Sequence, residues 1–302
     1  MKGAKAPFSK INSYEVSSQN QKEVRKLNQK GIFSGVMIAS DFDGTVFGPN
    51  IGMPPRNVAA AQHFMAEGGL FAIATGRTYV TFAPHHQLIP TNLPTILSNG
   101  ASVYDFSENR LLSLTQLPET AKEDMRTLCQ EMPSLAFEAY YGEAIYAHNP
   151  NEITDAHMKL VGETYTKSTI EDMPSPWVKV LIQQERNILQ TARERLLSLR
   201  ENHYEAIFSN PRYLEITAKG VCKGTAVKDL ATAHNIAPEH IYCVGDNEND
   251  LSMLALAKIP FAPSSSAEIV LATKPQILCP WEEGVLGDLI THLEKIYGGN
   301  SL

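Results

Sequence analysis

The stretch GVMIASDFDGTVFG, residues 35–48, places two aspartates one residue apart, directly after a short apolar run. The run at 36–39 is typical of a buried β-strand, and a Gly-Thr pair follows Asp43. Asp41 and Asp43 repel each other at this spacing, so a site built on them needs a cation. Because Asp-Gly is also a common turn, the stretch alone leaves both a turn and a functional site open.

The segments around this stretch alternate between short apolar runs and helical patterns, which indicates a parallel α/β sheet. A helix is expected at 56–67, before a Gly-Gly pair, and strands are expected at 70–77 and 94–101. The same alternation returns near the C-terminus. There we expect helices at 224–234, 266–273 and 285–297, and strands at 241–245, 259–262 and 275–279.

The middle of the chain has a different pattern. Residues 135–148, LAFEAYYGEAIYAH, alternate and turn at Tyr141-Gly142 like a hairpin. A strand at 177–183, an amphipathic helix at 185–200 and a strand pair at 204–210 and 212–217 are expected to follow. This block resembles a separate antiparallel α+β unit inserted into the first.

The sequence therefore predicts three parts. We expect an N-terminal extension at 1–34, with at most a short helix around 21–28, a core domain formed by 35–100 and 217–302, and an inserted domain at 101–216.

Composition limits the class of function. The 302 residues are 43% hydrophobic and 20% charged, as in an ordinary globular protein of about two domains. A net charge of -7 gives no support to nucleic-acid binding and favours a small ligand. The chain has no membrane-length apolar run and no signal-peptide core, and its four cysteines lack a metal or disulfide spacing. We expect a soluble cytoplasmic protein, and its oligomeric state is not indicated.

Ligands of open parallel sheets bind beyond the carboxyl ends of the strands. Neither acidic run of this chain has the glycine and glutamate spacing of an EF-hand, and P-loop and GxGxxG motifs are absent from the sequence. A bound phosphate would therefore be held in another way. The polar residues that follow the expected core strands are Asp41, Asp43, Thr75, Gly76, Arg77, Asn99 and 246–250.

Four segments, in this order, resemble the four motifs of the haloacid dehalogenase superfamily. They are DFDGT at 41–45, ATGR with Thr75, KGVCKG with Lys223, and GDNEND with Asp246. The insertion between the second and third motifs resembles the C2B cap of the Cof-type sugar phosphatases, with the order αββ(αβαβ)αββ. The resemblance covers about 36–297 and implies a Rossmann-like parallel-sheet core domain with an inserted α+β cap domain.

The chain departs from the Cof-type pattern in two places. About 35 residues precede the first motif, where such chains usually begin close to it. The loop APSSSAE, residues 262–268, stands where a Met-Gly-Asn-Ala-like sequence is common. The second departure concerns substrate preference rather than the reaction.

A carboxylate can attack phosphorus and form an aspartyl-phosphate that water then opens. The resemblance implies that Asp41 is this nucleophile. An anionic nucleophile meets an anionic phosphoryl group only with a cation between them, and Mg²⁺ suits carboxylate, phosphate and water ligands. Its protein ligands, again by resemblance, are the side chains of Asp41 and Asp246 and the backbone carbonyl of Asp43.

Asp43 has a second implied task. A sugar alkoxide needs a proton as it leaves, and the same carboxyl group can then deprotonate the attacking water. Lys223 would supply charge to the phosphoryl oxygens and to Asp41. Asp250 would support the metal site through its hydrogen bonds or, equally well, cap the helix that follows. Thr75 joins Asp41, Asp43 and Lys223 as a catalytic position.

The phosphate- and substrate-binding positions implied by the resemblance are Phe42, Thr75, Gly76, Lys223 and Asn249. Arg77, Lys219 and Arg212 are further candidate substrate-facing cations. The leading hypothesis is a Mg²⁺-dependent phosphatase that acts on small phosphorylated metabolites, above all sugar phosphates. A phosphomutase of the same superfamily and a non-enzymatic sensor of a phosphate ligand are the alternatives, and no motif identifies the substrate.

Overall fold

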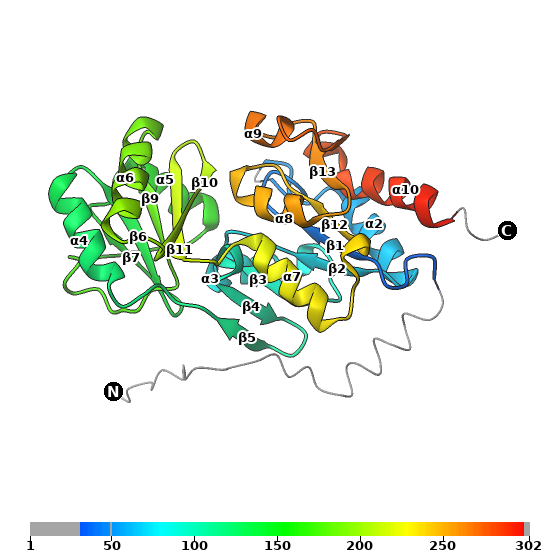
Figure 1. Cartoon of the computed structure of the whole chain (residues 1–302), viewed down its shortest axis with the longest axis horizontal. Coiled ribbons are helices and arrows are strands. Elements are labelled where there is room, and N and C mark those ends of the chain that lie inside the picture. Colours follow the sequence, from blue (N-terminus) through cyan, green and yellow to red (C-terminus); the bar gives the residue numbers. More distant parts are fainter. Residues whose placement is uncertain (1–30, 49, 299–302) are drawn as a thin grey trace.

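The computed structural model describes residues 31–48 and 50–298. Figure 1 shows two lobes side by side, one with the core sheet and α2, α7, α8 and α10, the other with α4, α5 and α6. Most of the expected extension at 1–34, and the helix expected around 21–28, lie outside the described residues.

The core sheet has the order β14-β13-β12-β1-β2, and its neighbouring strands run parallel. β1 lies between β2 and β12, and all its residues are buried because helices cover both faces of the sheet. The strands are β1 (Met37–Ser40), β2 (Leu70–Ile73), β12 (Ile241–Val244), β13 (Pro260–Pro263) and β14 (Gln276–Leu278).

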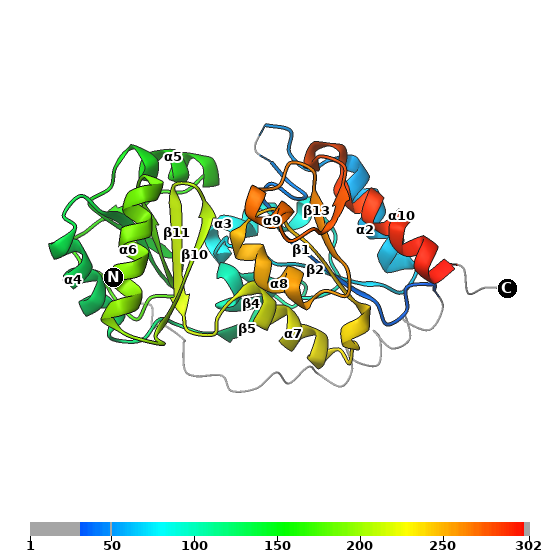
Figure 2. The same cartoon turned by 45° about the horizontal axis from the view of Figure 1, so that its top comes forward.

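Alternate residues of β1 pack against different helix pairs. Ile38 belongs to the apolar cluster formed with α2 (Pro55–Ala66) and α10 (Val285–Tyr297), which lie side by side in Figure 1 and Figure 2. Met37 and Ala39 belong to the cluster formed with α7 (Lys223–Ala233) and α8 (Leu251–Leu256). The described core is therefore a doubly wound α/β sheet, which confirms the predicted fold class.

A small antiparallel sheet of β3 (Thr95–Leu97), β4 (Ser102–Asp105) and β5 (Arg110–Leu114) joins the core through a single parallel bridge from Ile96 to Ala74. The strand expected at 94–101 is therefore too long. The chain leaves it at Ser98 and Asn99, whose φ values of 52° and 53° lie in the left-handed region and end a strand. The resulting turn places Asn99 beside Thr75, whose carbonyl accepts from the Asn99 amide at 3.0 Å.

The second lobe is built on a sheet with the order β10-β11-β9-β6-β7-β8. The hairpin expected at 141–142 is present, with Tyr141 paired to Ala144. The strands are β6 (Ala136–Tyr141), β7 (Ala144–His148), β8 (Thr166–Lys167), β9 (Lys179–Gln183), β10 (Tyr204–Asn210) and β11 (Tyr213–Ala218), and the helices are α4 (Ala121–Glu131), α5 (Glu152–Val161) and α6 (Arg186–Leu199).

The order of elements differs from the Cof-type order at one place. Residues 168–178, all of them described, form turns between β8 and β9 and contain no helix. Pro174 and Pro176 lack the N–H donors that a helix needs there. The helix expected at 266–273 is also shorter, at α9 (Glu268–Leu271).

The division at 101–216 stays a prediction, because β4 and β5 fall inside that range and yet pair with β3 rather than with the six-stranded sheet. Across residues 31–48 and 50–298, no helix combines the length and the apolar composition that crossing a bilayer requires.

The buried amide of Asn57 connects the loop after β1 with the last helix. Its Nδ2 donates to the Val46 carbonyl at 3.0 Å, and its Oδ1 accepts from the Leu286 amide at 2.9 Å.

We expect Asn57→Ala to lower the free energy of unfolding by about 2–4 kcal/mol, because two buried backbone groups lose their partner. Urea unfolding measures this, with the exposed Gln190→Ala on α6 as a control that should change it by less than about 0.5 kcal/mol. Equal effects of the two substitutions would contradict the expectation.

Candidate active site

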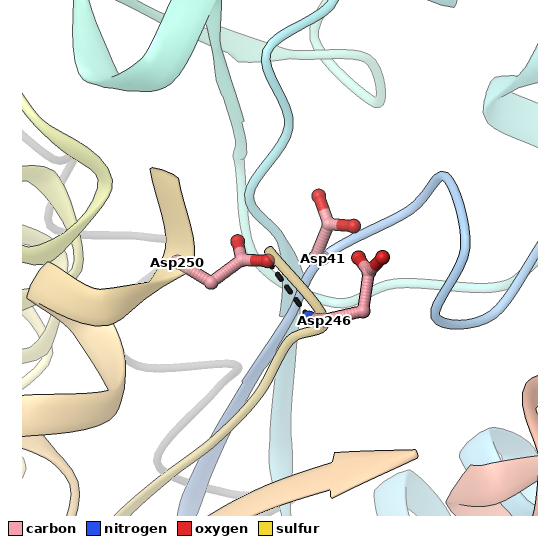
Figure 3. A group of neighbouring side chains, drawn as sticks. All are labelled: Asp41, Asp246 and Asp250. Carbon is pink, nitrogen blue, oxygen red and sulfur yellow. Dashed lines mark hydrogen bonds between the residues drawn. The ribbon is translucent and has the colours of Figure 1, made fainter. Parts of the chain in front are cut away.

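Three carboxylates meet where the core strands end. Asp41 follows β1, and Asp246 and Asp250 follow β12, the strand beside it. Oxygen atoms of the three side chains lie within 4.8 Å of one another. In Figure 3 the carboxylates of Asp41 and Asp246 lie next to each other, and Asp250 lies on the opposite side of the Asp246 backbone. The pairing of β1 with β12 thus brings together residues from the first and fourth motifs.

This group carries more negative charge than its surroundings compensate. Burial and the charge of Asp250 raise the pKa of Asp246 from 3.8 to about 7. Burial and the same Asp250 charge also hold the pKa of Asp41 well above its ordinary value, although Lys223 opposes this. The arrangement therefore favours binding either of protons or of a cation.

Lys223 is fully buried at the first position of α7. Its Nζ donates to Oδ1 of Asp41 at 2.5 Å and to Oδ1 of Asp250 at 2.6 Å. Burial disfavours its charge, but the two carboxylates outweigh this and raise the pKa of Lys223 above its ordinary value. Lys223 is therefore a charged lysine inside the site and not a solvated surface residue.

Asp250 organises the loop after β12. Its Oδ2 accepts from the amides of Asp246 at 2.9 Å and Asn247 at 3.0 Å, the first of which is drawn in Figure 3. Its Oδ1 accepts from Lys223. Both oxygens thus have protein partners, and the side chain makes no capping bond to α8. Asp250 instead completes a capping box with Asn247 at the 3₁₀ helix Glu248–Asp250, which leads into α8, and it also supports the acidic group through Lys223.

Asp43 does not join this group. Its carboxylate accepts two hydrogen bonds from Arg77, at 2.7 Å each, and its side chain is 45% exposed. The Arg77 guanidinium is buried against the rings of Phe42 and Phe47 and also donates to the Thr81 carbonyl at 3.0 Å. Arg77 is thus a fixed partner of Asp43, and its contact with Asp43 could not be foreseen from the motif.

The described structure has a cavity of about 210 Å³ between the core sheet edge and the second lobe. Thr75, Gly76, Arg77 and Asn249 line it together with the aspartates at 41, 43 and 246. Lys223 and Asp250 lie behind this wall. The lining from the second lobe includes Tyr140, His157, Leu160, Lys179, Tyr213 and Glu215.

Three other candidates do not contribute a side chain to the cavity. The candidate cations Lys219 and Arg212 pair with Glu205 and Glu185, and neither lines the cavity. The Phe42 ring is fully buried, so only its backbone could contact a ligand. Asn99 follows an expected core strand, but the sequence assigns it no role in binding or catalysis. In the structure its Oδ1 accepts from Nδ2 of Asn249 at 3.1 Å.

The chain is similar to known hydrolases. A family model described as haloacid dehalogenase-like hydrolase matches residues 38–285. The 5-amino-6-(5-phospho-D-ribitylamino)uracil phosphatase of Bacillus subtilis (strain 168) is 27% identical over 252 residues, and the match covers 73% of this chain and 84% of that protein. The pyridoxal phosphate phosphatase of Escherichia coli (strain K12) is 23% identical over 250 residues, with 78% of this chain and 90% of that protein covered.

Solved structures are similar in fold. A sugar phosphatase of HAD subclass IIB superposes with a TM-score of 0.75 at 20% identity, and the match covers 85% of this chain and 98% of that chain. At this identity the likeness concerns the fold.

The buried position of Lys223 leads to a prediction about stability. We expect Lys223→Met to lower the free energy of unfolding by about 3–5 kcal/mol in metal-free buffer at neutral pH, because it leaves two buried carboxylates without their cation. The loss should be smaller at pH 5, because the Asp41 carboxylate, whose pKa burial raises, then binds a proton instead. Urea unfolding at both pH values is the measurement. Lys228→Met, which removes an exposed lysine of the same helix, should be nearly neutral, and a similarly neutral Lys223→Met would contradict the expectation.

Proposed function

The chain belongs to the haloacid dehalogenase-like hydrolase family, and on that premise we propose that it is a Mg²⁺-dependent phosphatase of small phosphorylated metabolites, above all sugar phosphates. The observation that carries the proposal is the position of Asp41, which lines the cavity and accepts a hydrogen bond from the buried Lys223. A carboxylate held in this way can attack phosphorus and form an aspartyl-phosphate.

The residues present fit a magnesium ion. Asp41 and Asp246 offer hard oxygen ligands within 4.8 Å of each other, and their crowding favours a cation. Gly44 also supports the site: a Cβ there would lie 2.7 Å from Oδ2 of Asp246, so glycine lets the backbone after Asp43 approach that carboxylate closely. The two side chains and the Asp43 carbonyl would hold the ion. When bound, Mg²⁺ would offset the negative charge of the phosphoryl group and its nucleophile.

The residues around the cavity would then have separate roles in phosphoryl transfer. Lys223 holds one oxygen of Asp41 and so orients the nucleophile, and it adds positive charge behind it. The Thr75 hydroxyl, the Gly76 amide and the Asn249 side chain line the cavity and would donate to the phosphoryl oxygens. Asp43 lies at the same cavity, where it would protonate the leaving oxygen and later take a proton from water.

Two considerations favour hydrolysis over the alternatives. The two curated relatives described above are named as phosphatases rather than mutases. A sensor would not need a second carboxylate placed for proton transfer. The substrates in those two names differ in their leaving groups, so a panel of phosphorylated metabolites with Mg²⁺ is the direct way to find the substrate of this chain.

Two predictions follow from the proposed function, and the first tests the nucleophile. Wild-type protein should release inorganic phosphate from members of the panel only when Mg²⁺ is present, and Asp41→Asn should abolish release because it keeps the shape and removes the nucleophile. Asp229→Asn, which changes an exposed aspartate of α7, is the matched control and should retain wild-type turnover. Full activity of Asp41→Asn would exclude the covalent mechanism. Conversion of a hexose phosphate to its isomer, without release of phosphate, would favour the phosphomutase.

The second prediction separates Asp43 from Asp41 by the leaving group. For Asp43→Asn we expect turnover of a sugar phosphate to fall by roughly 100-fold to 10,000-fold, the usual effect of a positioned acid or base. With p-nitrophenyl phosphate, whose phenolate leaves without a proton, formation of the phosphoenzyme should be much less impaired. Since its hydrolysis still lacks a base, a burst of nitrophenolate followed by slow turnover should appear in rapid-mixing experiments.

The contrast between substrates is the decisive result for Asp43. Equal losses on both substrates, with no burst and no trapped phosphoenzyme, would assign Asp43 a structural role through Arg77.

A further inference from the structure

An ion pair of the second lobe lies almost completely buried at the cavity. Lys179 on β9 and Glu215 on β11 are 2.7 Å apart, and their side chains are 5% and 7% exposed. Burial opposes ionisation of Glu215, but the charge and hydrogen bond of Lys179 outweigh it, so the pKa of Glu215 is lower than its ordinary value. The pair is therefore charged, and Glu215 accepts hydrogen bonds without donating any.

The pair contacts the core at the turn after β2. Nζ of Lys179 donates to the Gly76 carbonyl at 2.7 Å. Oε2 of Glu215 accepts from Nδ2 of Asn99 at 3.0 Å. A Cβ on Gly76 would lie 2.8 Å from Oε1 of Glu215, so a side chain at position 76 would displace this carboxylate. The ion pair thus lies directly against the backbone proposed to bind phosphate.

The hydrogen bonds continue to Asn249, and their direction is determined by Glu215. Because a carboxylate only accepts, the NH₂ end of Asn99 must face Glu215 and its oxygen must face away. That oxygen accepts from Nδ2 of Asn249 at 3.1 Å, so the NH₂ end of Asn249 lies on this side. An amide NH₂ group has two N–H donors, and the second remains for a ligand in the cavity that Asn249 lines.

We propose that Lys179 and Glu215 are positioning residues that act through Asn99 to orient the Asn249 amide, so that an N–H rather than the carbonyl faces the phosphoryl group. The inference rests on the proposed function. Glu215, Asn99 and Asn249 form an amide relay, and Lys179 keeps its first member ionised. Since the ion pair belongs to the second lobe, the donor reaches its phosphate-binding orientation only when that lobe contacts the core.

Reversing the first link should reverse the relay. Glu215→Gln would not do this, because Oε2 of Glu215 accepts from both Lys179 and Asn99, and a glutamine oxygen at that place would accept from both as well. In the exchange Lys179→Glu/Glu215→Lys, the ammonium group at position 215 can only donate. Asn99 must then turn its oxygen toward position 215 and its NH₂ group toward Asn249, whose carbonyl replaces the donor at the phosphate. We expect the kcat/KM for a sugar phosphate and the affinity for inorganic phosphate in Mg²⁺ to fall by about 100-fold, the usual effect of losing an oriented donor.

A further substitution should restore the direction. When Asn99→Asp is added to this exchange, the carboxylate at position 99 accepts from the ammonium group at position 215 and again accepts from Asn249. Aspartate also tolerates the left-handed backbone at position 99. Phosphate affinity, measured by calorimetry, should return to within about threefold of the wild-type value.

Asp124→Asn is the matched control. Asp124 is a buried carboxylate of the same lobe that binds Arg200 and Tyr204, and it does not line the cavity. Its replacement should leave phosphate affinity unchanged even if the thermal unfolding midpoint falls. Wild-type phosphate affinity in the folded Lys179→Glu/Glu215→Lys variant would overturn the relay.

The variant that combines the exchange with Asn99→Asp keeps the inference testable if the exchange alone does not fold. Loss of phosphate binding in this folded variant would overturn the relay, and retained binding would support it. Failure of the proposed function is a distinct result, since wild-type protein itself would then release no phosphate from the panel.

Discussion

The repulsion among buried carboxylates at the end of β1 is the constraint on which the site depends. Asp41, Asp246 and Asp250 follow two strands that are neighbours in the sheet and far apart in the sequence, and Lys223 donates to two of them, Asp41 and Asp250. The loop after β12 keeps its shape because Asp250 accepts from two of its amides. Because burial and crowding disfavour so much negative charge, the group favours binding of protons or of a cation.

The second lobe contacts this site at the turn after β2. Lys179 donates to the Gly76 carbonyl there, and Glu215 accepts from the side-chain amide of Asn99. Arg186 and Arg193 of α6 also pair with Glu248, which lies in the fourth motif. The lobe therefore contacts two separate loops of the core, so its placement and the shape of the phosphate-binding backbone are linked.

The sequence predicted the parallel core, the hairpin of the second lobe and the family, because these follow from local patterns and from motif order. It could not predict the role of Asn99, whose partner Glu215 is 116 residues away and whose left-handed backbone ends a strand that its apolar pattern would continue. The pairing of Arg77 with Asp43 is likewise a tertiary contact, over 34 residues. The roles assigned to the aspartates stay predictions, because position alone does not show reactivity.

The two walls of the cavity come from different parts of the chain. The groups assigned to phosphoryl transfer follow core strands, where the parallel sheet determines their spacing. The opposite wall comes from α5 and the antiparallel sheet, and it combines the rings of Tyr140, His157 and Tyr213 with the half-exposed Leu160. Such a wall can change its side chains without disturbing the carboxylates. Related chains can therefore share one reaction and differ in leaving group, and for this reason the motifs that identify the chemistry do not identify the substrate.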